Sequence, residues 1–167
     1  MSLFGLLSLP TDLTLSEDQL KAAYDESPQE EQHLQARNSL LIPSIRLEQW
    51  MQSRGFAKTR HSSIPNEFIA LFSHISGCVT RISQLSEKKK SASSLLGQTL
   101  LDKQLFEQKP NLDILATKLD ALKAERLAEF HILQDTPSSD HANRLLQGLK
   151  FIQKWESELN KAYTNLL

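Results

Sequence analysis

The spacing of apolar residues is the feature that most constrains the fold of this chain. Large apolar side chains recur in steps of four and three at Phe68, Phe72, Ile75, Val79 and Ile82. A helix turns by about 100° per residue, so this spacing places them along one helical face. Two later stretches share the pattern: Leu112, Leu115, Leu119, Leu122, Phe130, Leu133, and then Leu145, Leu149, Ile152, Leu159, Leu166. Because no stretch alternates as a strand would, we predict an all-α fold.

Capping residues and prolines predict where the N-terminal helices begin and end. Residues 16–19 read Ser-Glu-Asp-Gln, the form of a capping box, so a helix should start at Glu17. Residues 27–30 read Ser-Pro-Gln-Glu and predict a second capping box, with Pro28 in the first helical position. That helix should run to about residue 41.

A third helix should open at Pro43 and close at Gly55, a residue suited to the left-handed conformation. Residues 57–64 are polar and basic without a clear period, and we interpret them as a linker. Residues 65–167 then contain the three long amphipathic stretches. Since none of these helices can bury its apolar face alone, we predict that they form an antiparallel three-helix bundle.

Composition narrows the classes of function. The 167 residues carry a formal net charge of −1, which gives no field for collecting nucleic acid. The basic run at residues 88–90 is short for a membrane-binding patch, and we expect it to be a solvated helix end or loop. A single cysteine, Cys78, fits a reducing compartment. We therefore expect a cytoplasmic protein that binds neither nucleic acid nor membranes.

The residues give little reason to expect catalysis. The sequence lacks the HExxH, CxxC, P-loop, GxGxxG and GxSxG motifs. His74 and Cys78 are four residues apart and would share a helix face, so a Cys–His nucleophile is one interpretation. Such a pair also needs an orienting third group and a cleft, and burial of Cys78 as a small apolar residue is the simpler interpretation. We expect no enzyme, no metal site and no cofactor.

Several segments resemble one family in their order and spacing. Residues 4–10, Phe-Gly-Leu-Leu-Ser-Leu-Pro, resemble the start of a J-domain, and residues 19–24 resemble the opening of its second helix. Ala36 and Leu40 fall at matching positions of its third helix. Residues 42–56 resemble the His-Pro-Leu-Met-Arg-Ala-Glu-Tyr-Leu-Leu segment and the Gly-Phe corner of the HscB/Jac family, the J-proteins of iron–sulfur cluster assembly. Residues 149–154 resemble that family's Leu-Arg-Phe-Leu-Asp-Lys.

This resemblance implies an L-shaped protein. Residues 1–56 would be a shortened, degenerate J-like helical hairpin, and residues 65–167 an HscB-like bundle. In the family, the bundle binds the IscU-type scaffold and the J-domain docks on an HscA/DnaK-type chaperone.

The sequence departs from the family where the chaperone would dock. No His-Pro-Asp tripeptide occurs, and only eleven residues separate Tyr24 from Ala36. Residues 16–26 hold four carboxylates and one lysine, a net charge of −3 on a helix that is basic in the family. The segment from residue 65 to residue 76, which is rich in Glu in the family, has only Glu67. We therefore expect chaperone docking to be doubtful and ATPase stimulation to be lost.

Two large apolar residues lie off the main stripes of their helices. By helical geometry Ile69 and Phe151 each sit roughly 100° from the centre of their stripe. They also match the scaffold-contacting Leu and Phe of the family. We predict a partner-binding patch of Phe68, Ile69, Phe72 and Phe151. The alternative is that both flanks are buried by the bundle itself, the J-like domain or a loop.

Three functions remain open at this point. The first is an HscB-like co-chaperone relative that binds an IscU-type scaffold. The second is a helical adaptor module that kept the architecture and changed its partner. The third, an enzyme built on His74 and Cys78, has the least support.

Overall fold

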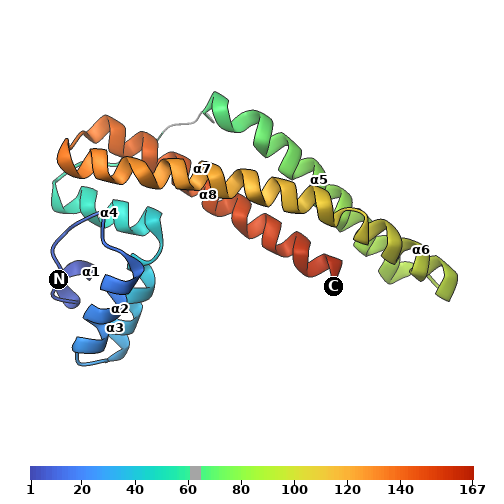
Figure 1. The fold of residues 1–167 in the computed structure, drawn as a ribbon, viewed down its shortest axis with the longest axis horizontal. Helices are drawn as coiled ribbons and strands as arrows, with labels where there is room; N and C mark the ends of the chain where they lie inside the picture. Colours follow the sequence, from blue (N-terminus) through green and yellow to red (C-terminus); the bar gives the residue numbers. More distant parts are fainter. Residues whose placement is uncertain (61–64) are drawn as a thin grey trace. The chain divides into compact units, whose positions relative to one another are not determined.

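The computed structural model describes residues 1–60 and 65–167, with the side chain of Glu67 also left out (Figure 1). Within these residues all regular secondary structure is helical, which confirms the predicted all-α class. The chain divides into two compact units. Described residues 1–60 and 124–150 form unit 1, and described residues 65–123 and 151–167 form unit 2.

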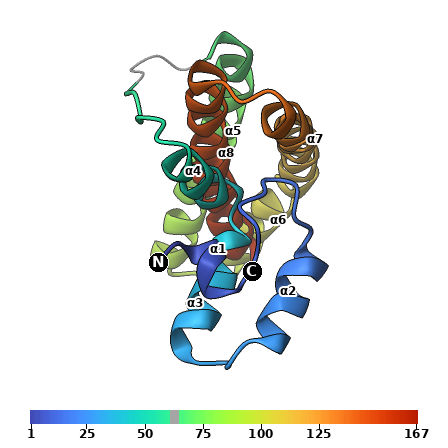
Figure 2. The same ribbon diagram turned by 90° about the vertical axis from the view of Figure 1, so that its left-hand side faces the viewer.

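Unit 1 begins with short helices. They are α1 (Leu3–Leu6), α2 (Glu17–Glu26), α3 (Glu31–Leu40) and α4 (Pro43–Ser53). Figure 2 shows α2 and α3 running in opposite directions and joined by a short turn. Both α1 and α2 contact α3. Buried residues of these helices and of the loop before α2 form a small apolar core: Phe4, Leu7, Leu15, Leu20, Ala36 and Leu40.

The two predicted capping boxes have different outcomes. The box at Ser16 is confirmed, since its Oγ accepts from the Gln19 N–H at 3.2 Å and its own N–H donates to Gln19 Oε1 at 2.8 Å. The box at Ser27 is wrong, because α3 begins only at Glu31. Ser27 Oγ instead donates to the Tyr24 carbonyl at 2.6 Å and helps to end α2. Gln29 has a φ of +55°, which interrupts helical geometry between Pro28 and α3.

The predicted limits of α4 are confirmed. Pro43 occupies its first turn, where the missing N–H leaves no hydrogen bond unmade. Gly55 has a φ of +69° just beyond its C-terminus, a conformation that glycine adopts without steric cost.

Arg46 ties these N-terminal segments together from inside unit 1. Its buried guanidinium donates to the carbonyl oxygens of Leu40 at 2.9 Å, Leu13 at 3.2 Å and Leu15 at 2.9 Å. Burial lowers the pKa of Arg46 from its usual value, while the charge of Glu17 acts in the opposite direction. The side chain thus fixes the loop before α2 against the start of α4.

Two long helices contribute to both units: α7 (Lys109–Asp135) and α8 (Ser139–Leu166). In unit 1, Trp50 of α4 donates its indole N–H to Gln134 Oε1 at 3.0 Å. A second apolar core joins α4 to this part of α7 and α8: Leu13, Leu47, Trp50, Met51, Phe130, Leu133, Ala142, Leu145, Leu146 and Leu149. The division therefore differs from the predicted boundary at residue 65, because α4 buries its apolar face against residues 124–150.

The structure describes only the first four residues of the predicted linker at 57–64, and two of them are bonded to Asn143. Asn143 is buried; its side chain donates to the Ala57 carbonyl at 3.0 Å and accepts from the Thr59 N–H at 2.9 Å. These bonds hold the first part of the linker on unit 1. Residues 61–64 lie outside the described part of the chain.

Unit 2 contains α5 (Asn66–Ser91), α6 (Leu95–Phe106), and the remaining parts of α7 and α8. Its core buries the stripes seen in the sequence: Phe68, Phe72, Ile75, Ile82, Leu85, Leu105, Leu112, Leu115, Leu119, Ile152, Leu159 and Ala162. The helix α6 was not expected. It packs on α5 through Leu101 and Leu105. None of the described helices combines the length and the apolar composition needed to cross a membrane.

Candidate partner-binding surface

Four aromatic rings meet where α5 packs against α8 in unit 2. Phe72 lies at the centre of this aromatic cluster, with its ring centroid 5.3 Å from Phe68, 5.3 Å from Trp155 and 5.8 Å from Phe151. Phe68 and Phe72 stand one turn apart on α5, whereas Phe151 and Trp155 stand one turn apart on α8. The i, i+4 spacing thus brings each pair onto the same side of its helix.

The residues predicted to bind a partner differ in their exposure. Phe68 and Phe72 are buried core residues, so in this conformation neither offers a surface to a partner directly. Phe151 is half-buried and packs on the core. Ile69 is exposed, with 51% of its surface accessible. Contact with a partner remains a prediction for Ile69 and Phe151. Phe68 and Phe72 belong to the buried core of unit 2.

Ile69 is exposed because of its place on α5. It lies about 100° around the helix from the buried Phe68. Residue 72 is three positions along, so Ile69 and Phe72 are neighbours on the helix surface. Phe72 thus has Ile69 as its neighbour on α5 by helix geometry and Phe151 of α8 in ring contact with it. No part of unit 2 covers Ile69 enough to make it core, which was the alternative interpretation of its off-stripe position.

Charged residues of α8 lie next to Trp155 of the aromatic cluster in the sequence, and one of them contacts its ring. The Lys154 ammonium lies 5.6 Å from the Trp155 ring centroid, a cation–π contact. Lys123 forms an ion pair with Glu156 at 2.8 Å. The one carboxylate that the sequence provides on the first turns of α5 is Glu67, whose side chain lies outside the described atoms.

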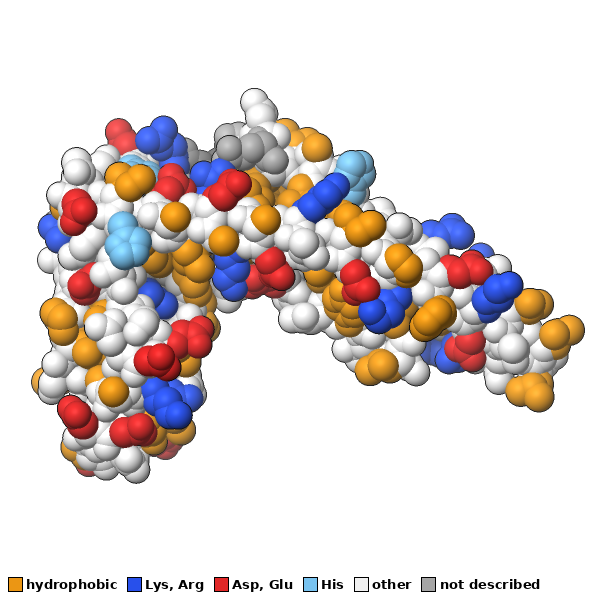
Figure 3. All heavy atoms as spheres, in the orientation of Figure 1, with side chains coloured by type: hydrophobic (Ala, Val, Ile, Leu, Met, Phe, Trp, Pro, Cys, Tyr) orange, Lys and Arg blue, Asp and Glu red, His pale blue; other side chains and the backbone are white. Residues whose placement is uncertain are grey.

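A second apolar surface lies on α6. Its exposed large side chains are Leu95 at 81%, Leu96 at 70%, Leu100 at 54% and Phe106 at 74% exposure. Orange hydrophobic side chains gather over α6 in Figure 3. Ser94 caps the N-terminus of α6, since its Oγ accepts from the Gly97 N–H at 3.0 Å. This serine cap was the available sequence signal for α6, but the leucines on all sides give the helix no amphipathic period.

His74 and Cys78 lie in one shallow pocket of about 420 Å³ between α5 and the start of α7. Arg81 and Asn111 also line it. Burial raises the pKa of the Cys78 thiol above its usual value. A catalytic cysteine needs the thiolate, so this shift opposes a nucleophilic role. The pocket confirms that the two residues share a face and assigns them no chemistry.

Among residues 1–60 and 65–167, no three His, Cys, Asp or Glu side chains come together in a way that could hold a metal ion. None of the protein-family models, curated proteins or solved structures with which the chain was compared matches it.

Proposed function

We propose that this protein is an HscB-like co-chaperone relative that binds an IscU-type iron–sulfur scaffold, or a similar client, through residues of its C-terminal helices. We propose further that it no longer stimulates the ATPase of an HscA/DnaK-type chaperone. Both parts rest on the sequence resemblance together with observations in each unit.

The observation that carries the binding proposal is the exposure of Ile69, together with the half-buried Phe151 in ring contact with Phe72. The exposed isoleucine and the half-buried phenylalanine stand at the positions that match the family's scaffold contacts, and buried aromatic rings pack beside the phenylalanine. Rigid aromatic anchors with apolar neighbours are the usual source of binding energy at protein interfaces. Interfaces usually have a polar rim around their apolar centre, and Lys154, which contacts the Trp155 ring, would be part of such a rim.

The loss of ATPase stimulation is supported by the connection between α2 and α3. Only residues 27–30 join these helices, and they read Ser-Pro-Gln-Glu rather than containing His-Pro-Asp. The exposed face of α2 is acidic, the reverse of the basic face in the family. An acidic face would repel a partner surface that pairs with basic residues.

A second candidate function is a helical adaptor with a different partner. The observation that favours it is the exposed apolar surface of α6, which the resemblance does not explain. Large exposed apolar patches are typical of interaction sites.

A pull-down of the full-length protein with an IscU-type scaffold separates the two candidates. Under the first proposal the scaffold is retained, and an Ile69→Ala substitution reduces its retention. Under the second, scaffold is not retained, and the α6 surface carries binding to some other protein. The third possibility, an enzyme built on His74 and Cys78, would be dismissed if alkylation of Cys78 caused no loss of activity.

A further inference from the structure

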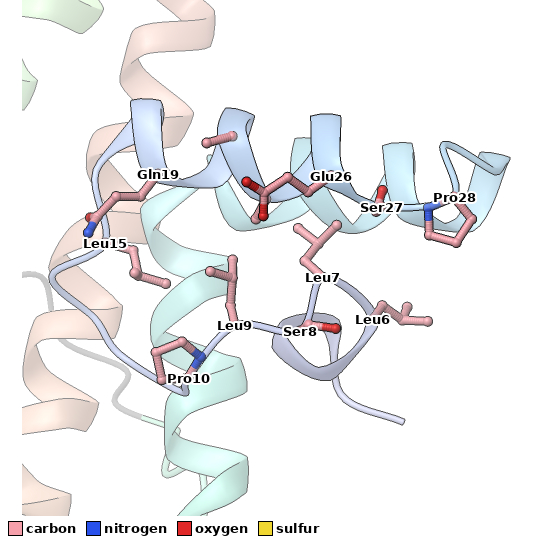
Figure 4. A pocket seen from close by; sticks show the side chains of 12 residues that line it. Leu6, Leu7, Ser8, Leu9, Pro10, Leu15, Gln19, Glu26, Ser27 and Pro28 are labelled. Carbon is pink, nitrogen blue, oxygen red and sulfur yellow. The ribbon is translucent and has the colours of Figure 1, made fainter.

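Unit 1 contains a pocket of about 490 Å³ between the N-terminal loop and α2, separate from the surfaces described above. Figure 4 shows the residues that line it. The N-terminal loop contributes Leu7, Leu9 and Leu15, and α2 contributes Ala22 and Glu26. We name this feature the α2 pocket.

The inner wall of the α2 pocket is apolar and fixed by the fold. Leu7 and Leu15 belong to the small core of unit 1, and Leu9 packs against it. Ser8 has a φ of +54°, and the Leu9 N–H donates to the Phe4 carbonyl at 2.9 Å. This tight turn directs the side chains of Leu7 and Leu9 toward α2, as Figure 4 shows. The small side chain of Ala22 leaves room opposite them.

Glu26 places a carboxylate at the α2 pocket (Figure 4). Glu26 and Asp25 lie in the last turn of α2, which has no basic residue. A negative charge at a helix C-terminus opposes the helix dipole, so these two residues destabilise α2. Neither takes part in an ion pair among the described residues. No ion pair of the described residues therefore offsets the destabilisation of α2 by these two carboxylates.

The segment that contains α2 carries a concentrated negative charge. Residues 16–31 contain six carboxylates and one lysine, a net charge of −5 in a chain whose total is −1. All seven side chains are exposed. Acidic side chains are visible over α2 in Figure 3. Such a local field attracts cationic partners and repels anionic ones.

We propose that the α2 pocket is a docking site for a basic, amphipathic peptide segment of a partner protein. An apolar side chain of leucine size would enter between Leu7, Leu9 and Ala22, while a neighbouring Lys or Arg would pair with Glu26. The apolar wall supplies contact area and the carboxylates supply charge complementarity. This site lies in unit 1, so it does not depend on the scaffold-binding proposal for unit 2.

The test uses the full-length protein and a short fluorescein-labelled peptide with Lys and Leu on opposite helix faces. Two matched peptides replace every Lys by Glu or every Leu by Ser. Fluorescence anisotropy should show binding of the Lys/Leu peptide only. Glu26→Lys and Ala22→Trp should each weaken it about tenfold or more, the first by charge reversal and the second by filling the pocket.

Asp135→Lys is the matched control, because it changes the net charge as much as Glu26→Lys at an exposed helix end that does not line the α2 pocket. It should leave peptide binding unchanged. Equal weakening by Asp135→Lys, equal binding of the Glu/Leu peptide, or no binding of any peptide would overturn the proposal. Sedimentation adds a further outcome: self-association that Glu26→Lys abolishes would make a second copy the occupant and would also overturn it. Thermal melts verify that both pocket variants are folded.

Discussion

The ring centroid of Phe151 lies 5.8 Å from that of Phe72, and this contact joins α8 to α5. Phe72 is buried, with 4% of its surface accessible, and Phe151 is half-buried. Phe151 therefore belongs both to the core of unit 2 and to its surface. The sequence alone predicted that Phe151 belongs to a partner-binding patch and left open the alternative that it is buried.

Alanine substitutions should separate these two roles of the phenylalanines. Phe72→Ala should lower the free energy of unfolding by about 3–5 kcal/mol, since it removes a fully buried ring. Phe151→Ala should lower it by about 1–2 kcal/mol, because part of that ring already contacts water. Urea denaturation followed by circular dichroism measures both values. A cost for Phe151→Ala equal to that for Phe72→Ala would show that Phe151 is entirely core.

The buried guanidinium of Arg46 should be essential for unit 1. Arg46→Met would leave three backbone carbonyls without their donor, and we expect a loss of about 2–4 kcal/mol in unfolding free energy. Arg54→Met is the matched control. Arg54 is exposed and its guanidinium lies 4.6 Å from the Trp50 ring centroid, so its loss should cost about 0.5–1 kcal/mol. Equal effects of the two substitutions on the urea midpoint would contradict this account.

Tyr163 should ionise late in a pH titration. Burial, followed by a 2.6 Å hydrogen bond to Asp113 Oδ1, raises the pKa of Tyr163 to about 12. An unfolded tyrosine ionises near pH 10, so the folded state keeps its proton longer. This contribution to stability is fully present below about pH 10 and is lost as the pH rises toward about 12.

Phenolate absorbance of a Tyr24→Phe variant isolates Tyr163, since the chain has two tyrosines. The expected midpoint is about 12. Asp113→Asn should move it down, though not fully to the unfolded value, because burial is the larger cause. A midpoint near 10 in the Tyr24→Phe protein would mean that Tyr163 is solvated.

The protein should fail to accelerate an HscA/DnaK-type ATPase. The four residues between α2 and α3 contain no His-Pro-Asp, and α2 presents carboxylates where the family presents basic residues. A steady-state ATPase assay with excess protein measures this, with an intact J-protein as the positive control. Acceleration comparable to that control would refute the proposed loss of coupling.

Much of the fold could be predicted from local signals, and the misses have physical causes. The apolar steps from Phe68 onward and the caps at Ser16 and Gly55 are local, so they predict α5, α2 and α4 well. The predicted capping box at Ser27 is wrong because Gln29 adopts a positive φ, which its residue type does not indicate. The helix α6 was missed because its leucines point both into the core and into solvent. The grouping of residues 124–150 with α4 depends on long-range packing around Trp50, which no local pattern encodes.

The candidate surface could be predicted only in part. Helical geometry placed Ile69 and Phe151 off their stripes, and the structure leaves Ile69 exposed. The same geometry could not say that Phe72 would be covered by both Phe151 and Trp155. The α2 pocket was invisible in the sequence, because it depends on the left-handed turn at Ser8 that directs two leucines toward α2.

Calorimetric titration of the protein with an IscU-type scaffold tests the central claim most directly. Ile69 and Ile132 are both exposed isoleucines, at 51% and 59%, but Ile132 belongs to unit 1, whereas Ile69 and the aromatic cluster belong to unit 2. We predict that the wild-type protein binds, that Ile69→Ala weakens binding by about 1–3 kcal/mol, and that Ile132→Ala leaves it unchanged. Absence of binding by the wild-type protein, or equal effects of the two substitutions, would contradict the proposed scaffold-binding function.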